Sequence, residues 1–278
     1  MRRRVSTAAA LTARLGSRSD RALRRARRLG LAAVSPLDSA VARLNGKHPF
    51  PPIHLRRQVG PLASFETAAG EFAVLLATAG RMRAGSTLLD VGCGCGTLPL
   101  ALGGRLGAGG RYVGLDVDPV AIAWCERHLA GGNRSFAVHD YWNAYYNPGG
   151  RRFEPFAVED AAVDVVLMKS VLTHVLPEDL TFNLREVARV LRPAGTALLT
   201  VFAYDAVDDA VRALCPHDAG AYRYRREAAP EAAIAYPEAW LREQLTAAGL
   251  EGELRPGLWR GEHADGPVHQ DLLVVRRA

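Results

Sequence analysis

Three glycines and an acid form the first cluster in the chain that could do chemistry. Asp90 lies in the apolar run 87–91, and Gly92, Gly94 and Gly96 follow it at every second position. Glycine adopts backbone angles that other residues avoid, and its missing side chain lets a ligand come close to the main chain. A strand that ends in such a turn and continues into a helix therefore predicts a binding site for a small polar ligand.

Two common nucleotide-binding loops do not fit this spacing. A nicotinamide dinucleotide loop carries glycine at its first, third and sixth positions, whereas the sixth residue counted from Gly92 is Thr97. A Walker phosphate loop ends in Gly-Lys-Ser or Gly-Lys-Thr, and neither tripeptide follows this turn. An oxidoreductase that uses a nicotinamide cofactor is therefore disfavoured.

A second acid lies where an adenosine would need one. The run 111–116 ends in Asp116, 20 residues after Gly96, and a carboxylate at this strand end binds the ribose diol in doubly wound folds. Asp118 directly precedes Pro119 and is the better candidate for a helix cap. We therefore interpret Asp116 as a ribose ligand.

The elements that must position these residues alternate along the chain. Five β-rich runs are expected strands, 87–91, 111–116, 135–139, 163–168 and 195–202, and all of them except the third are near-continuously apolar. Two later runs, 252–259 and 271–275, are expected to add a terminal pair of strands. Near-continuously apolar strands that alternate with helices are typical of a parallel sheet covered on both faces. The prediction is an α/β fold, with a doubly wound, mostly parallel seven-stranded sheet behind an N-terminal helical extension.

The ordered motifs resemble those of the class I S-adenosylmethionine-dependent methyltransferases. The acid before a Gly-x-Gly-x-Gly turn resembles the family's first motif, and acids follow at the next two strand ends. The helix and turn at 185–195 are similar to those before the family's fifth strand, although Ala194 departs from the usual Pro-Gly-Gly. Segments 145–150, 173–179 and 270–275 look like a bacterial small-molecule branch of the family.

The resemblance implies S-adenosylmethionine as the cofactor and a Rossmann-like fold. It also implies that Asp116 binds the ribose, that Asp140 binds the adenine amino group and that a neighbouring side chain lies against the ring. Lys169, at the end of the fourth strand, either orients an anionic group or neutralises Asp90 and Asp140. The residues expected to contact the cofactor are Asp90, Gly92, Cys93, Gly94, Gly96, Asp116, Val117, Asp140, Tyr141 and Lys169.

His174 is the candidate general base. It lies in the loop after the fourth strand, where the acceptor should bind, and imidazole titrates near neutral pH. A structural histidine packed at the start of a helix is the alternative interpretation. An aromatic and amide cluster after the third strand is typical of sites for small polar ligands. The residues expected at the acceptor are Arg57, Trp142, Tyr145, Tyr146, Asn147 and Tyr222, and no metal site is predicted.

The expected reaction is methyl transfer to a small molecule, most simply to an oxygen of a sugar or secondary metabolite. An N- or C-methyltransferase on the same fold and a non-catalytic cofactor-binding protein are the alternatives. The tetrapeptide at 146–149 is similar to a motif of nucleobase amino methyltransferases, but that motif follows the fourth strand rather than the third. We therefore expect a small-molecule acceptor and no nucleic acid.

The positive charge of the chain is concentrated at one end. The 278 residues carry a formal charge of +6, yet residues 1–28 hold ten arginines and one acid, a local +9 that leaves the rest at −3. A nucleic-acid surface spread over the folded body is therefore not supported. The arm fits a solvated tail, a weak contact with an anionic membrane or an organellar transit peptide, and the sequence does not choose among them.

We divide the chain into an arginine-rich arm at 1–45, helical or disordered, a helical cap at 46–84 and a methyltransferase domain at 85–278. Within the last part, residues 203–240 are too long for an ordinary connection and are expected to form a lid. The chain has no run of apolar residues long enough to span a membrane, and its four cysteines lack the spacing of a zinc site. Both features predict a cytoplasmic protein with reduced thiols.

Overall fold

A computed structural model of the protein describes residues 7–261 and 268–278. Its main sheet contains the strands β1 (Thr87–Val91), β2 (Arg111–Asp116), β3 (Arg134–Val138), β4 (Val163–Met168), β5 (Leu191–Val201), β10 (Leu250–Arg255) and β11 (Asp271–Arg277). Their order is β10-β11-β5-β4-β1-β2-β3; β11 is antiparallel to both of its neighbours and the other pairs are parallel. The predicted doubly wound, mostly parallel seven-stranded sheet is confirmed.

The register of the three central strands brings their carboxyl ends together. Val91 at the end of β1 pairs with Leu115 of β2 on one side and with Met168 of β4 on the other. The residues that directly follow these strands therefore meet at one edge of the sheet. Loops at this edge are where ligands bind in open α/β sheets.

Strand β5 begins earlier than the sequence pattern predicts. Leu191 already pairs with Val163 of β4, and the register then shifts so that Thr196 pairs with Val165. The extra residues form a bulge in which Ala194 has a φ of 63°, a left-handed conformation that is uncommon for a residue with a side chain. The turn predicted before the fifth strand is thus an irregular part of the strand itself.

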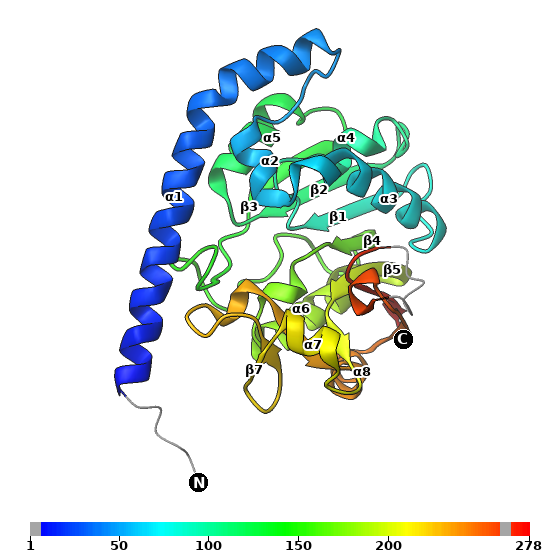
Figure 1. Ribbon diagram of the computed structural model, residues 1–278. Helices are drawn as coiled ribbons and strands as arrows, with labels where there is room; N and C mark the ends of the chain where they lie inside the picture. The colour runs from blue at the N-terminus through cyan, green and yellow to red at the C-terminus, as the bar shows by residue number, and fades with distance from the viewer. Residues whose placement is uncertain (1–6, 262–267) are drawn as a thin grey trace.

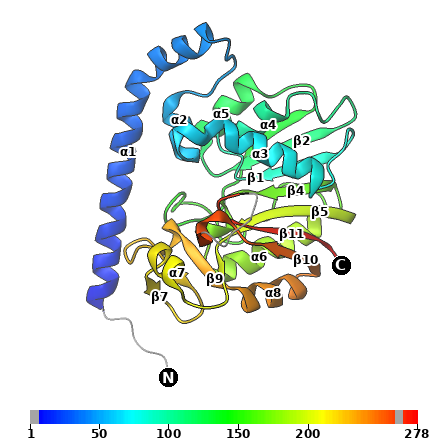
Figure 2. The ribbon, with the colours of Figure 1, turned by 45° about the vertical axis from the view of Figure 1, so that its right-hand side comes forward.

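Helices cover both faces of the sheet, as Figure 2 shows. One core lies between the sheet and the buried faces of α6 and α8, and a second core packs α3, α4 and α5 against the opposite face. Apolar strands buried on both faces are what holds the central strands in place. The helices are α1 (Thr7–Leu44), α2 (Ile53–Val59), α3 (Phe65–Thr78), α4 (Thr97–Leu102), α5 (Pro119–His128), α6 (Pro177–Val190), α7 (Asp209–Leu214) and α8 (Glu238–Ala247).

Helix α1 is the longest element and runs along one side of the molecule (Figure 1). Polar contacts connect its described side chains to the rest of the chain. The Arg28 guanidinium lies 2.9 Å from a carboxylate oxygen of Asp118, and Ser35 Oγ lies 2.7 Å from His54 Nδ1. Asp38 accepts a 2.5 Å hydrogen bond from Arg56. Residues 7–44 of the sequence-predicted arm are therefore one helix, whose second half is fastened to α2.

Helix α2 and the residues after it lead from α1 into the sheet. Among the described helices, none alone has the length and apolar character of a membrane span; only α2 combined with residues 62–78 meets that standard, across an 89° bend. Leu55 of α2 and Phe65 of α3 are buried against Cys95 and Ala121. This apolar cluster includes Cys95 of the glycine turn, so α2 packs against that turn at the edge of the predicted site.

The insertion at 203–240 folds into a small layer of its own. Its four short strands, in the order β6-β9-β8-β7, are β6 (Ala203–Tyr204), β7 (His217–Asp218), β8 (Arg223–Tyr224) and β9 (Ile234–Pro237). The hydroxyl of Tyr236 in β9 donates to the backbone carbonyl of Val175. The insertion is therefore packed on the segment that follows β4, where the candidate base lies.

Candidate functional site

A cleft of about 590 Å³ opens at the carboxyl ends of the central strands. Its floor is the glycine turn and the end of β2, and one wall is the turn at 143–148. Helices α1 and α2 supply the opposite side, with Arg25, Arg28, Leu55, Gln58 and Val59. The cleft is thus placed where the sheet topology requires it.

The glycine turn allows close approach at two of its three positions. Gly92 and Gly94 have φ values of 79° and 55° and line the cleft. A Cβ on Gly92 would lie 2.5 Å from a methyl group of Val171, and one on Gly94 would lie 2.9 Å from a methyl group of Val59. Any larger residue here would be strained and would also narrow the cleft.

Gly96 has a different role from the predicted ligand contact. It is absent from the cleft lining, and its φ of 77° marks the start of α4. A Cβ at this position would lie 2.3 Å from Leu129 Cδ1 and 3.1 Å from Cys125 Sγ. Gly96 therefore allows α4 to pack closely on α5 and shapes the turn from behind.

Asp116 is held rigidly at the end of β2. One carboxylate oxygen accepts a 2.7 Å hydrogen bond from the Gly94 backbone N–H, and the other accepts a 2.8 Å bond from the Asp118 N–H. Burial raises the pKa of Asp116 to about 6, and the two backbone donors oppose this rise. Each carboxylate oxygen keeps a further acceptor position, so the group suits two adjacent hydroxyls.

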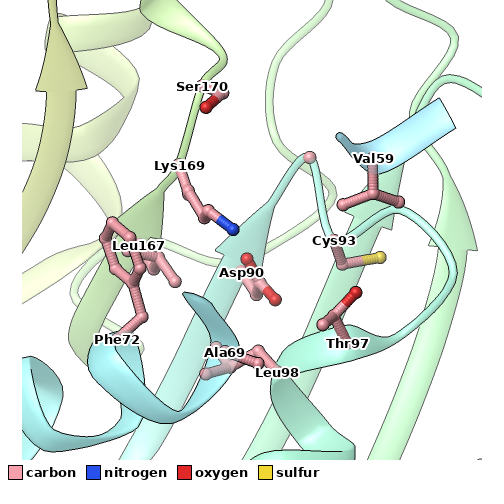
Figure 3. A pocket seen from close by; sticks show the side chains of 11 residues that line it. Val59, Ala69, Phe72, Asp90, Cys93, Thr97, Leu98, Leu167, Lys169 and Ser170 are labelled. Atoms are coloured by element: carbon pink, nitrogen blue, oxygen red, sulfur yellow. The ribbon is translucent and has the colours of Figure 1, made fainter. Parts of the chain in front are cut away.

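Asp90 lies deeper, in a small hollow that adjoins the cleft (Figure 3). It accepts a 2.6 Å hydrogen bond from the Tyr112 hydroxyl, and the Lys169 ammonium points toward it. Burial raises the pKa of Asp90 to about 7, an effect that the Tyr112 hydrogen bond and the Lys169 charge oppose. Lys169 also lies 5.3 Å from the centre of the Phe72 ring and lines both spaces.

The end of β3 differs from the prediction in one residue. Tyr141 lines the cleft as expected, together with His139. Asp140 does not, because its side chain points to Arg151, with 3.6 Å between carboxylate and guanidinium, and accepts from Asn147. Successive side chains near a strand end point to opposite sides, which explains why the neighbours of Asp140 face the cleft in its place.

Of the predicted acceptor residues, three lie in the cleft wall and three lie elsewhere. Tyr145, Tyr146 and Asn147 line the cleft. Arg57 donates to the backbone carbonyl of Gly60, Trp142 lies under the Arg152 guanidinium, and Tyr222 packs against Tyr224; none of these three lines the cleft. Arg57 lies outside the cleft lining, whereas the next two residues of α2, Gln58 and Val59, belong to it.

His174 lines the same cleft and has a defined ring orientation. Its Nδ1 lies 2.9 Å from the backbone carbonyl of Glu231, which comes from the insertion. A carbonyl can only accept, so Nδ1 carries the proton and Nε2 is the basic nitrogen. Nε2 lies 3.5 Å from the Tyr146 hydroxyl, and burial lowers the pKa of His174.

Several lining residues escaped the sequence analysis. Arg25 and Arg28 were part of the basic arm, and only the fold brings them to the cleft. The two arginines are three residues apart, so both lie on one face of the helix. This spacing is visible in the sequence, but it does not say what that face covers. Val117, at the end of β2, and Cys93, in the glycine turn, lie where predicted, Val117 in the cleft and Cys93 in the adjoining hollow.

The residues present fit S-adenosylmethionine, the cofactor that the glycine turn implies. Asp116 offers acceptors to a ribose, while Gly92 and Gly94 leave space that a Cβ would fill. His139 is buried, lines the cleft, and its Nε2 has no hydrogen-bond partner among the described residues. Such an unsatisfied buried nitrogen is expected where a ligand completes the site.

Within the same described residues, no cluster of histidine, cysteine or acidic side chains could hold a metal ion.

Comparisons with known proteins agree with this geometry. Residues 89–199 match the family described as methyltransferase domain. The chain is 28% identical over 115 residues to a demethylmenaquinone methyltransferase of Lactobacillus johnsonii, a match that covers 41% of this chain and 43% of that protein. It is 29% identical over 115 residues to the tRNA N(3)-cytidine methyltransferase METTL2 of Gallus gallus, a match that covers 40% of this chain and 29% of that protein. The chain thus spans less than half the length of these curated relatives.

A solved structure covers much more of the fold. An S-adenosylmethionine-dependent methyltransferase of Methanosarcina mazei aligns with a TM-score of 0.51 and 21% identity over 70% of this chain and 93% of its own. At this identity the likeness concerns the fold. Together with the matched domain and the glycine turn at the end of β1, it leads to one conclusion: residues 89–199 form a methyltransferase domain, and the fold around them is similar to that of S-adenosylmethionine-dependent methyltransferases.

Proposed function

We propose that the protein transfers a methyl group from S-adenosylmethionine to an oxygen of a small molecule such as a sugar or a secondary metabolite. When bound, the cofactor supplies a methyl carbon activated by its positive sulfur. The acceptor oxygen forms the new C–O bond as the S–C bond breaks, and the acceptor must lose its proton. A hydroxyl needs a base for this step, whereas a neutral amine does not.

The observation that carries the proposal is the orientation of His174. Its Nδ1 is fixed on the Glu231 carbonyl, so the unprotonated Nε2 is directed to the side where the Tyr146 hydroxyl lies. Because burial lowers the pKa of this histidine, the ring is neutral and able to accept a proton at neutral pH. These features support a general base in the wall of the cleft.

Other residues of the chain hold the reactants. Asp116 and the glycine turn would bind the adenosine, and His139 and Tyr141 lie at the adjoining wall. Asp90 and Lys169 would face the amino-acid end from the neighbouring hollow. Helices α1 and α2 shield the opposite side from water, which favours alignment of the two reacting atoms.

The proposal includes a cytoplasmic location. All four cysteines are buried thiols without disulfide bonds, which is usual for proteins of a reducing compartment.

Replacing His174 by alanine tests the base. We expect kcat to fall by roughly 100-fold or more, while the affinity for S-adenosylhomocysteine, measured by calorimetry, stays within about twofold because the histidine lies in the acceptor wall. His217→Ala is the matched control, since that ring stacks on Tyr224 outside the cleft. An unchanged rate in the His174 variant would assign this residue a structural role.

The acceptor is found by transfer of labelled methyl groups to panels of sugars, phenols, amines and tRNA. Transfer to hydroxyl compounds supports the proposal. Preferential labelling of amines or carbon acceptors would establish N- or C-methylation, and labelling of tRNA would overturn the small-molecule assignment. Binding of S-adenosylhomocysteine without transfer to any class would indicate a non-catalytic cofactor-binding protein.

A further inference from the structure

Helix α1 contributes two arginines to the cleft that the proposed reaction uses. Arg25 and Arg28 are three residues apart on this helix, and both line the same cleft as Asp116, Tyr146 and His174. The proposed methyl transfer assigns neither arginine a function. Because the body of the chain is slightly acidic, two cations at a ligand cleft need a specific explanation.

Arg28 already has a counter-charge. Its guanidinium lies 2.9 Å from Asp118, and the two side chains are about one-quarter exposed, at 27% and 23%. Asp118 also accepts from the Val120 N–H and caps α5. This ion pair fixes the position of α1 over the end of β2, so the arginine one turn earlier is held at the cleft as well.

Arg25 lines the cleft without an acid beside it among the residues whose side chains the structure describes. In helix α1 these are residues 22, 23 and 25–44, and none of them, nor any described residue of the body, forms an ion pair or hydrogen bond with its side chain. The other cation of the cleft, Lys169, faces Asp90 (Figure 3). Arg27 of the same helix is exposed, as Arg25 is, but it does not line the cleft.

The cofactor would add to this positive charge, because its sulfur is cationic until the methyl group leaves. An acceptor with an anionic group would offset the charge of Arg25 and gain a bidentate contact with its planar guanidinium. A neutral acceptor would leave that guanidinium paired with solvent alone. The charge balance of the cleft therefore favours an anionic acceptor.

We propose that Arg25, assisted by Arg28, binds a carboxylate or phosphate group of the methyl acceptor and so selects acidic acceptors over neutral ones. This inference rests on the proposed function, because it assigns a second ligand to the same cleft. It also gives the amino-terminal helix a direct part in substrate choice.

The test is calorimetry on the full chain saturated with S-adenosylhomocysteine. The probes are two matched pairs: 4-hydroxybenzoate with its methyl ester, and glucose 6-phosphate with glucose. Comparing the two pairs distinguishes a site for carboxylates from a site for phosphates. We expect the acidic member of at least one pair to bind about tenfold more tightly than its neutral partner. Arg25→Gln should remove about tenfold of that affinity, which is the usual size of a charge-assisted hydrogen bond.

Arg27→Gln is the control and should bind all probes as the parent does. Arg25→Lys keeps the charge and should restore part of the affinity. The inference is overturned if neither acidic probe outbinds its neutral partner, if Arg25→Gln and Arg27→Gln behave alike, or if Arg25→Gln weakens S-adenosylhomocysteine instead. Failure of the parent chain to bind S-adenosylhomocysteine would contradict the proposed function itself, and that measurement is made first.

Discussion

At the scale of single residues, the site depends on carboxylates whose charge is set by their surroundings. Asp90 is buried and Asp116 is half-buried, and only Asp116 meets the cleft directly and is oriented by two backbone N–H groups. Burial disfavours the ionised carboxylate, which raises the pKa of Asp116 to about 6. Its protonation therefore falls in a range that solution experiments can reach.

Cofactor affinity should follow the ionisation of Asp116. Ribose hydroxyls donate to the ionised carboxylate, so the Kd for S-adenosylhomocysteine should rise as pH falls from 8 through about 6. Asp116→Asn should weaken binding by about tenfold at pH 8, the usual loss when a hydrogen bond to a charged group is removed, and should flatten the pH dependence. Calorimetry at several pH values measures both; a variant with the parent's pH dependence would exclude Asp116 as its source.

At the scale of elements, the insertion at 203–240 and the turn at 143–147 meet around the candidate base. The backbone carbonyl of Glu231 orients His174, while the buried carboxylate of the same residue accepts from the Ala144 N–H. Asn143 adds a 2.7 Å bond from its side-chain amide to the His174 carbonyl. Glu231 thus connects the insertion with the turn at 143–147 and with the segment that carries His174.

Glu231 should consequently act as a positioning residue for His174. In Glu231→Ala the carbonyl remains, but the turn that carries Tyr146 loses its buried acceptor, so we expect kcat to fall about tenfold and the pH profile of kcat to shift. Glu231→Gln keeps an acceptor oxygen and should recover most of the activity. Equal losses in both variants, with an unchanged pH profile, would show that Glu231 supports folding alone.

The sequence predicted best what depends on local pattern. The glycine turn, Asp116 and the existence of seven strands follow from spacing and β-rich runs. The bounds are less exact, because a bulge at Ala194 extends β5 at its start and β10 spans Leu250–Arg255 instead of 252–259. Asp140 was predicted to bind the cofactor but lies outside the cleft lining, because the side on which a residue emerges depends on the last residues of the strand. Arg25 and Glu231 could not be found, since long-range packing alone brings α1 and the insertion to the cleft.

At the scale of the whole molecule, two separate cores on the two faces of one sheet leave the carboxyl edge of the sheet to ligands. The packed clusters against α6 with α8 and against α3 with α4 and α5 contain none of the α1 residues whose side chains the structure describes. Helix α1 is joined to the body chiefly by polar contacts around Arg28, Ser35 and Asp38. The rigid sheet holds the floor of the cleft, and a lightly attached helix forms its outer side.

This arrangement has a kinetic consequence, because the proposed function assigns the cofactor and the acceptor to the same cleft beneath α1. The glycine turn and Asp116 lie on its floor, so a ligand bound there should arrive first and depart last. Steady-state analysis should then give an ordered sequential mechanism, with S-adenosylhomocysteine competitive against the cofactor and noncompetitive against the acceptor. Competitive inhibition against both substrates would mean that either substrate can bind first.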